Sequence, residues 1–87
     1  MAYQIKYWAR AKKSLSRIPN LDRQRIARGI DDLSRDPRPM GCEKMKGMED
    51  TYRIRVGDYR VVYEIVDQVL IVYVVRVDHR KDVYRKR

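Results

Sequence analysis

Residues 51–64, TYRIRVGDYRVVYE, decide the fold of this chain. From Thr51 to Val56, apolar or aromatic residues alternate with polar ones, and a second run of this kind extends from Tyr59 to Val66. A period of two is the pattern of a β-strand with one buried face. Gly57-Asp58 is a two-residue connection between the runs, and glycine in its first position is typical of a type II′ hairpin. The segment therefore predicts two antiparallel strands joined by a tight turn.

A third strand is predicted after this hairpin. Asp67-Gln68 indicates a second tight turn, and the run from Val69 to Val77 is apolar at almost every position. A strand that is apolar on both faces is typical of the centre of a sheet that is covered on both sides. The polar segment from Asp78 to Arg87 is expected to be a tail with one short helical turn.

The N-terminal half begins with a strand and continues with a helix. Residues Tyr3 to Tyr7 alternate with a period of two, which predicts a strand. From Trp8 to Ile18 the apolar residues are spaced by three and four, as on the buried side of a helix. Pro19 is expected to end this helix.

A second helix is predicted between Pro19 and Asp36-Pro37. Asn20 or Asp22 can provide its N-cap by accepting backbone N–H bonds. Gly29 inside the helix costs up to about 1 kcal/mol relative to alanine, and a close contact with another helix or the sheet would explain it. Residues 37–50 contain two prolines and two glycines and are predicted to form a loop. The buried stripe of the helix is expected to consist of Ile26, Ala27, Ile30 and Leu33.

These elements predict an α+β fold with the order strand, helix, helix, strand, strand, strand, in a single domain over residues 1–87. Two consecutive helices pack on one face of a sheet, so we expect both helices on one face of a four-stranded, mainly antiparallel sheet. The opposite face is then open. Because Ile54 faces the helices, Arg53 and Arg55 point to the open face. Arg60, just after the hairpin turn, is expected to join them.

The chain is strongly basic. It has 21 Lys and Arg against 12 Asp and Glu, a net charge of +9, and both halves carry an excess of positive charge. Such a protein attracts polyanions, because each neutralised phosphate releases counterions; a charge that serves only solubility is the alternative. No apolar run is long enough to span a membrane and no signal peptide is visible, so a cytoplasmic protein is expected. Cys42 is the only cysteine, which excludes an intrachain disulfide.

The open face is the first candidate site. Arg53, Arg55 and Arg60 lie on paired strands, so their side chains can converge. Their mutual repulsion is unfavourable unless an anion is present, and the arginine fork matches phosphate oxygens. The alternative is a solvated strand face with ion pairs to Glu64 or Asp58.

The C-terminal segment is the second candidate site. Histidine is the residue type that changes its protonation near neutral pH, and His79 stands beside Arg80 directly after the third predicted strand. Tyr84 lies in a charged segment, where it can stack on a base or exchange a proton. The alternative is an inert surface histidine and a tyrosine that only packs. Without a phosphate-binding glycine loop or a metal-ligand cluster, we expect metal-independent chemistry and no cofactor.

Three segments carry a resemblance to a known family. They are Lys44-Met45-Lys46-Gly47, the hairpin from Tyr52 to Glu64, and His79-Arg80-Lys81-Asp82-Val83-Tyr84. Together they resemble the C-terminal half of RelE-type toxins of toxin–antitoxin systems, and the helical half matches the same fold in order and length. The resemblance implies that the protein cleaves messenger RNA in the ribosomal decoding site. It also implies a cognate antitoxin that wraps the toxin and blocks this activity.

The resemblance also implies a set of functional residues. Carried over by position, the set is Arg53, Arg55, Arg60, Arg80 and Tyr84, to which Lys46 adds a phosphate-binding side chain. His79 stands where family members have a basic residue or histidine. The best-known members have lysines where this chain has Arg53 and Arg55, and arginine is a poor proton carrier.

The expected reaction is attack of a ribose 2′-hydroxyl on the adjacent phosphate. Arg60 and Arg80 would stabilise the charge of the phosphorane, while Arg53, Arg55 and Lys46 would hold the RNA backbone. Proton transfer is left to His79 or Tyr84.

Two other functions stay open at this point. A ParE-like inhibitor of DNA gyrase has the same fold and needs no catalytic residues, although the segment ending in Tyr84 argues against it. A RelE-like nucleic-acid-binding homologue could have lost activity through the change from lysine to arginine on the strand. The expected partners are a cognate antitoxin, the ribosome and messenger RNA, with no membrane.

Overall fold

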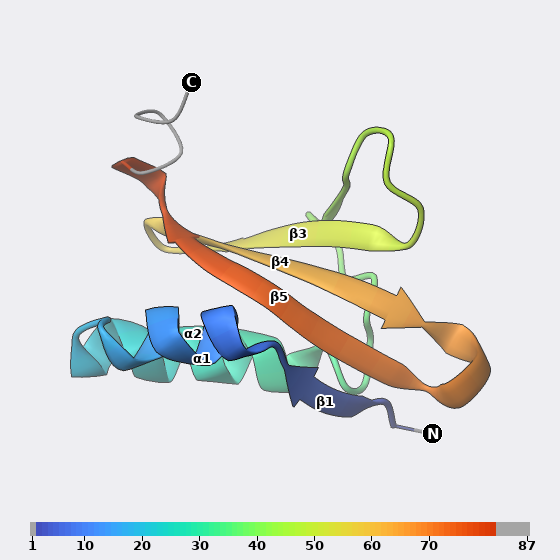
Figure 1. The fold of residues 1–87 in the computed structure, drawn as a ribbon, viewed down its shortest axis with the longest axis horizontal. Helices are drawn as coiled ribbons and strands as arrows, with labels where there is room; N and C mark the ends of the chain where they lie inside the picture. Colours follow the sequence, from blue (N-terminus) through green and yellow to red (C-terminus); the bar gives the residue numbers. More distant parts are fainter. Residues whose placement is uncertain (1, 82–87) are drawn as a thin grey trace.

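The computed structural model describes residues 2–81. The elements follow the order β1 (Gln4–Tyr7), α1 (Ala9–Ser16), α2 (Asn20–Asp32), β2 (Glu43–Lys44), β3 (Thr51–Val56), β4 (Tyr59–Val66), the 3₁₀ helix η1 (Asp67–Val69) and β5 (Ile71–His79). Both helices lie on one side of the sheet and leave its other face open (Figure 1). The predicted α+β class and the placement of the helices are therefore confirmed.

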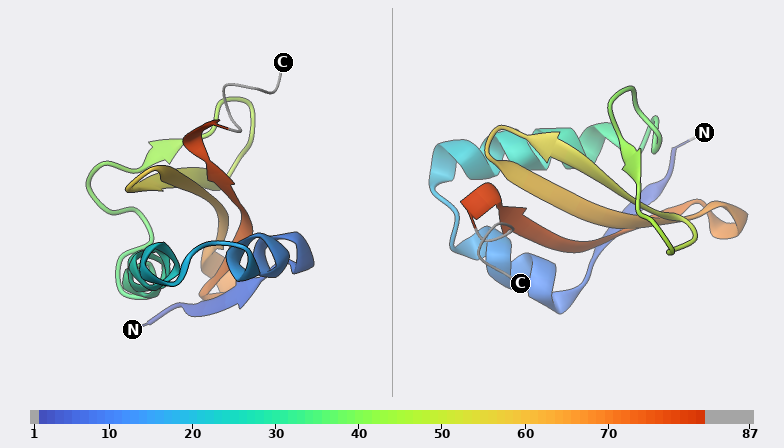
Figure 2. Two further views of the ribbon diagram at one scale, coloured as in Figure 1. Left: turned by 90° about the vertical axis from the view of Figure 1, so that its left-hand side faces the viewer. Right: turned by 90° about the horizontal axis from the view of Figure 1, so that it is seen from above.

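The sheet has five strands in the order β1-β5-β4-β3-β2, with β1 parallel to β5 and all other pairs antiparallel. The prediction of four strands was one short. The additional strand is β2, which pairs Glu43 with Arg53 and Lys44 with Tyr52 inside the segment predicted as a loop. A strand of two charged, exposed residues has no alternation that a sequence pattern could reveal. Seen from the side, the sheet is strongly twisted above the two helices (Figure 2).

The predicted hairpin is present between β3 and β4. Gly57 has a φ of 60°, and Asp58 is not among the described residues with positive φ. Positive φ at the first turn residue alone distinguishes type II′ from type I′, so the predicted turn type is confirmed.

The connection from β4 to β5 differs from the prediction. Asp67 begins the 3₁₀ helix η1, and the turn closes at Leu70, which has a φ of 55°. The strand expected from Val69 to Val77 therefore runs from Ile71 to His79. Val69 is apolar but 60% exposed, so its hydrophobicity misplaced the start of the strand.

The N-terminus of α2 also differs from the prediction. Pro19 is the N-cap residue, and no side chain caps the helix. Asn20 Oδ1 instead accepts a hydrogen bond from the Arg23 guanidinium at 3.0 Å, and Asp22 lies in the first turn. The fixed φ of Pro19, −54°, positions the chain for the helix without a side-chain cap.

The core lies between the helices and the inner face of the sheet. A Cβ atom on Gly29 would lie 3.1 Å from Val56 Cγ2, which confirms the close helix–sheet contact expected there. Of the described residues, no helix is both long and apolar enough to cross a membrane. Among residues 2–81, the fully buried hydrophobic side chains are Ala11, Ile26, Ile30, Leu33, Val61, Tyr63, Ile65, Val72 and Val74.

Candidate phosphate-binding face

Arg53, Arg55 and Arg60 share the open face of the sheet, as predicted. Arg55 on β3 is the direct cross-strand partner of Arg60 on β4, and Arg53 lies opposite Val62. Their neighbours Ile54 and Val56 pack against the core on the other face. The alternation of β3 and the tight turn after it therefore place three guanidinium groups on one surface.

Two adjoining hollows connect these arginines with Arg80. The first has a volume of about 260 Å³ and the second about 190 Å³. Both are lined by Arg55 and Arg60; Arg53 lines the first and Arg80 the second. We call the surface formed by Arg53, Arg55, Arg60 and Arg80 the arginine face.

The four guanidinium groups differ in their acidic partners. Arg53 donates from Nε to Glu43 Oε1 at 2.6 Å. Arg80 lies 3.7 Å from Asp58 Oδ1, at the long end of ion-pair distances. Within residues 2–81, Arg55 and Arg60 form no ion pair. Like charges directly opposite each other destabilise a sheet, and a bound anion would relieve the repulsion.

Arg76 and Asp78 also belong to the open face, and neither was among the predicted site residues. Arg76 lies opposite Val62, and Asp78 lies opposite Arg60. Arg76 Nε is 2.9 Å from Asp78 Oδ2, but the pair is not aligned as a hydrogen bond. The sequence contained a signal, because the alternation of Arg76, Val77 and Asp78 places the two charged residues on one face.

His79 does not join the arginine face. It is the cross-strand partner of Tyr59, and both lie on the helix side of the sheet. The two rings meet edge to face with centroids 4.9 Å apart, and His79 Nδ1 accepts the backbone N–H of Lys81 at 3.0 Å. The sheet therefore separates this imidazole from Arg55 and Arg60.

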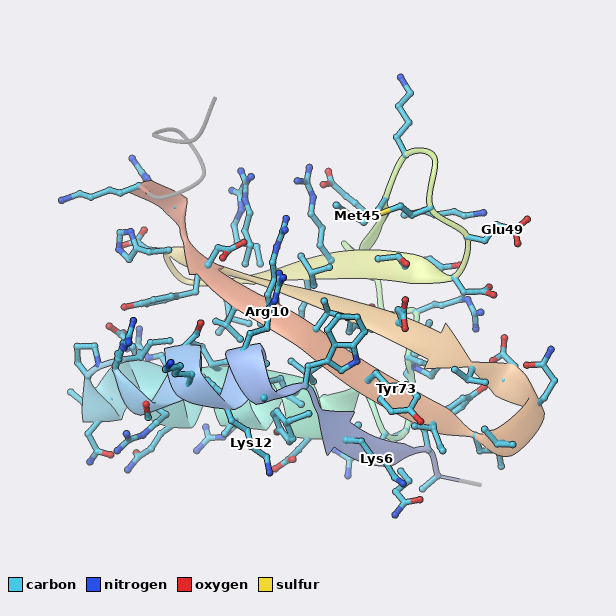
Figure 3. All side chains as sticks on the ribbon, in the orientation of Figure 1. Lys6, Arg10, Lys12, Met45, Glu49 and Tyr73 are labelled. Carbon is cyan, nitrogen blue, oxygen red and sulfur yellow. The ribbon has the colours of Figure 1, made fainter. Side chains whose placement is uncertain are left out.

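The remaining predicted site residues lie apart from these hollows or outside the described residues. Lys46 is exposed in the segment between β2 and β3 and lines neither hollow. This segment, with Met45 and Glu49 labelled in Figure 3, projects to the side away from the helices. Tyr84 lies outside the described residues.

Gly41 and Glu43 line the first hollow of the arginine face, and a cluster of polar side chains holds the start of the segment that contains them. Arg38 donates to Asp67 Oδ2 at 2.9 Å and to the Tyr52 hydroxyl at 3.1 Å. Tyr3 donates to Asp67 Oδ1 at 2.6 Å. The hydrogen bonds from Arg38 and Tyr3 lower the pKa of Asp67. The cluster therefore connects the residue before β1, the start of this segment, β3 and η1.

Tyr63 on β4 holds the same segment through a buried hydrogen bond. Its hydroxyl donates to the Pro37 carbonyl at 2.7 Å, and its side chain is fully buried. Burial raises the pKa of Tyr63, so the phenol keeps its proton and remains a donor. The ring also stacks on Tyr52 with centroids 6.1 Å apart.

Comparison with known proteins places this architecture in a family. The family model described as the ParE toxin of the type II toxin–antitoxin system parDE matches residues 5–84. Toxin RelG of Mycobacterium tuberculosis is 32% identical over 87 residues, which are 99% of this chain and 100% of RelG. The mRNA interferase toxin RelE of Escherichia coli is 29% identical over 83 residues, which are 93% of this chain and 86% of RelE.

The structural similarity is equally extensive. A chain of the RelE–RelB complex from Pyrococcus horikoshii superposes with a TM-score of 0.82 and 28% identity, over 92% of this chain and 97% of that chain. The family match, the relatives and the fold agree. The chain belongs to the ParE family of toxins from type II toxin–antitoxin systems, as a RelE-type member.

Proposed function

We propose that this toxin is an endoribonuclease that cleaves messenger RNA in the decoding site of the ribosome and so arrests translation. The observation that carries the proposal is the pair of opposed arginines, Arg55 and Arg60, which form no ion pair among residues 2–81, since Asp78 opposite Arg60 pairs with Arg76. Arg80 lines the same hollow. Like charges are held together here at a cost to folding, as expected of a site for a phosphate.

The proposed reaction requires charge stabilisation and two proton transfers. The ribose 2′-oxygen forms a bond to the adjacent phosphorus, and the bond from phosphorus to the 5′-oxygen breaks. Arg60 and Arg80 stabilise the additional negative charge of the phosphorane, and Arg53 and Arg55 hold the backbone. Guanidinium groups supply this charge, so the proposed mechanism uses no metal ion or cofactor.

A base must take the proton of the 2′-hydroxyl, and an acid must protonate the leaving 5′-oxygen. Arginine carries protons poorly. Because His79 faces the helices, the proposal assigns proton transfer first to Tyr84 and only second to His79. Lys46, exposed in the segment between β2 and β3 and apart from the hollows, is assigned to more distant phosphates of the strand or the ribosome.

A cognate antitoxin is the proposed protein partner. The solved relative from Pyrococcus horikoshii is a RelE–RelB complex, and a chain with a net charge of +9 complements an acidic segment. We also propose that residues 1–87 form a single toxin domain. This domain is proposed to act in the cytoplasm, where ribosomes are found.

Gyrase inhibition is the second candidate function, because the matching family model describes a ParE toxin. RelE of Escherichia coli is an mRNA interferase by name, and the unpaired arginines favour RNA phosphates. In cells, DNA damage and filamentation with unaffected translation would support gyrase inhibition.

The decisive experiment is cleavage of messenger RNA on programmed ribosomes. Wild type is expected to cut, whereas Arg60→Ala, Arg80→Ala and Tyr84→Ala are each expected to cut at least tenfold more slowly, since each removes a preorganised charge or a proton carrier. Arg35→Ala is the matched control, because Arg35 is exposed and, within residues 2–81, its side chain pairs only with Asp32. No cutting by wild type would refute the enzyme, and variants as fast as wild type would refute the site.

A further inference from the structure

A third hollow with basic side chains lies on the helix side of the sheet. It has a volume of about 250 Å³ and lies between the C-terminal end of α1 and the end of β5. Its lining residues are Ser14, Arg17, Ile18, Tyr59, Val77 and His79. We call it the α1 hollow.

The polar groups of the α1 hollow favour an anion. Because His79 Nδ1 accepts the Lys81 N–H, a neutral ring carries its proton on Nε2 and can donate from there. Arg17 is exposed, forms no ion pair within residues 2–81 and offers a guanidinium. Ser14 adds a hydroxyl donor. The lining residues include no carboxylate.

The N-terminal segment that supplies Ser14, Arg17 and Ile18 to this hollow is also free of acidic groups. No aspartate or glutamate precedes Asp22 in the sequence, whereas five lysines and arginines do. Arg10 and Lys13 on α1 and the C-cap residue Arg17 follow one another at helical spacing, so they lie on the same side of this helix. Lys12 leaves the helix on a different side from Arg10 (Figure 3).

The α1 hollow and the arginine face meet at one end of the sheet. Tyr59 lines the α1 hollow, and its neighbour Arg60 lines both hollows of the arginine face. In the same way His79 lines the α1 hollow, and its neighbour Arg80 lines the arginine face. A strand that crosses this end of the sheet passes from one set of donors to the other.

The acidic groups of the described residues lie in several places, and two of them, Glu43 and Asp58, line the hollows of the arginine face, whereas none lines the α1 hollow. Glu49, Asp50 and Glu64 line a separate hollow beside the end of β4 that leads into η1. Three cations, Arg17, Arg60 and Arg80, line the hollows that meet at this end of the sheet. Continuity with the arginine face favours a nucleic acid over an acidic protein as the ligand.

We propose that the α1 hollow is a second phosphate-binding subsite, which takes a phosphodiester of the same RNA strand that lies on the arginine face. The inference rests on the proposed function for the RNA on the arginine face. Arg17 supplies the charge, and Ser14 and His79 supply hydrogen bonds to the phosphate oxygens. The subsite adds affinity only for strands long enough to reach it.

The test compares short and long RNA on the full-length protein. Fluorescence anisotropy at low salt measures binding of 2′-O-methyl RNA, which lacks the attacking hydroxyl, at lengths of about 4 and about 12 nucleotides. Arg17→Ala is expected to weaken binding of the long RNA about fivefold, the upper range for one exposed ion pair, and to leave the short RNA unchanged. The salt dependence of long-RNA binding should fall by about 0.7 in slope.

Lys12→Ala is the matched control, because Lys12 is an exposed cation on α1, the helix that ends before Arg17, and does not line the hollow. It should bind both RNAs as wild type does. Three outcomes would overturn the inference. The two substitutions could weaken binding equally, Arg17→Ala could weaken binding of the short and the long RNA equally, or wild type could bind no RNA. Loss of polyglutamate binding by Arg17→Ala with RNA binding intact would also overturn it, because this result would indicate an acidic protein ligand.

This assay is independent of the cleavage test. If binding depends on RNA length through Arg17 but the protein does not cleave messenger RNA on ribosomes, the proposed subsite is supported and the proposed enzymatic activity is refuted. Cutting by a protein without the length effect would refute only the subsite.

Discussion

The opposition of Arg55 and Arg60 makes a quantitative prediction about folding. Arg55 has a cationic cross-strand neighbour on β4, and the short β2 does not extend far enough to pair with it. Replacement by glutamate therefore turns a repulsive pair into an attractive one. Removal of a directly opposed like charge and gain of an opposite-charge pair each contribute about 0.2 to 1 kcal/mol. We expect Arg55→Glu to stabilise the fold by about 1 kcal/mol at low salt.

The measurement is thermal unfolding followed by circular dichroism. For a chain of this size, about 1 kcal/mol raises Tm by roughly 4 to 8 °C. Because Arg55 is exposed, salt screens the interaction, and the gain should fall by more than half in about 1 M NaCl. The variant is also expected to lose messenger RNA cleavage, so stability and activity move in opposite directions.

The control separates this pair from the net charge of the protein. Lys46→Glu changes the net charge by the same amount, but Lys46 is exposed and does not line the hollows of the arginine face. If Arg55→Glu is no more stable than Lys46→Glu, or if its gain is insensitive to salt, the two arginines do not repel each other in the folded protein. The main support for a phosphate site on this face would then be lost.

Two predictions concern the polar contacts that hold the segment carrying Gly41 and Glu43. The pKa of Asp67 is lowered in the folded protein, so its contribution to stability is present above its ordinary pKa of 3.8 and is lost as the pH falls through the folded value. The stabilities of wild type and Asp67→Asn, measured by unfolding at several pH values, should therefore differ near neutral pH and converge in acid. A difference that stays constant with pH would contradict this prediction. Tyr63→Phe removes the donor to the buried Pro37 carbonyl and should lower the free energy of unfolding, measured in urea, by about 1 to 3 kcal/mol. The control is Tyr73→Phe, because the Tyr73 side chain forms no hydrogen bond within residues 2–81, and it should lower this free energy by less than about 0.5 kcal/mol. Equal losses in the two variants would exclude the hydrogen bond as the cause.

The hairpin shows why much of the site was predictable from sequence. The alternation around Ile54 determines the face of Arg53 and Arg55, and a two-residue turn determines the register that brings Arg60 opposite Arg55. Both signals are local. In contrast, Glu43 reaches Arg53 through a two-residue strand whose position depends on tertiary contacts, such as the hydrogen bond from Tyr63 to Pro37. No local pattern could have predicted that pair.

The face of His79 was missed for a different physical reason. Val72 and Val74 are buried and so is Val77, although Val74 and Val77 have opposite parity along the strand. The register shift opposite Val62 and Tyr63 accounts for this change of parity. Because this register shift, a β-bulge, changes which parity faces the helices, valines of both parities are buried and the run looks apolar on both faces. The alternation that continues from Val77 to His79 is therefore not visible in the sequence. His79 therefore lies with Val77 on the helix side, where the α1 hollow, and not the arginine face, is within its reach.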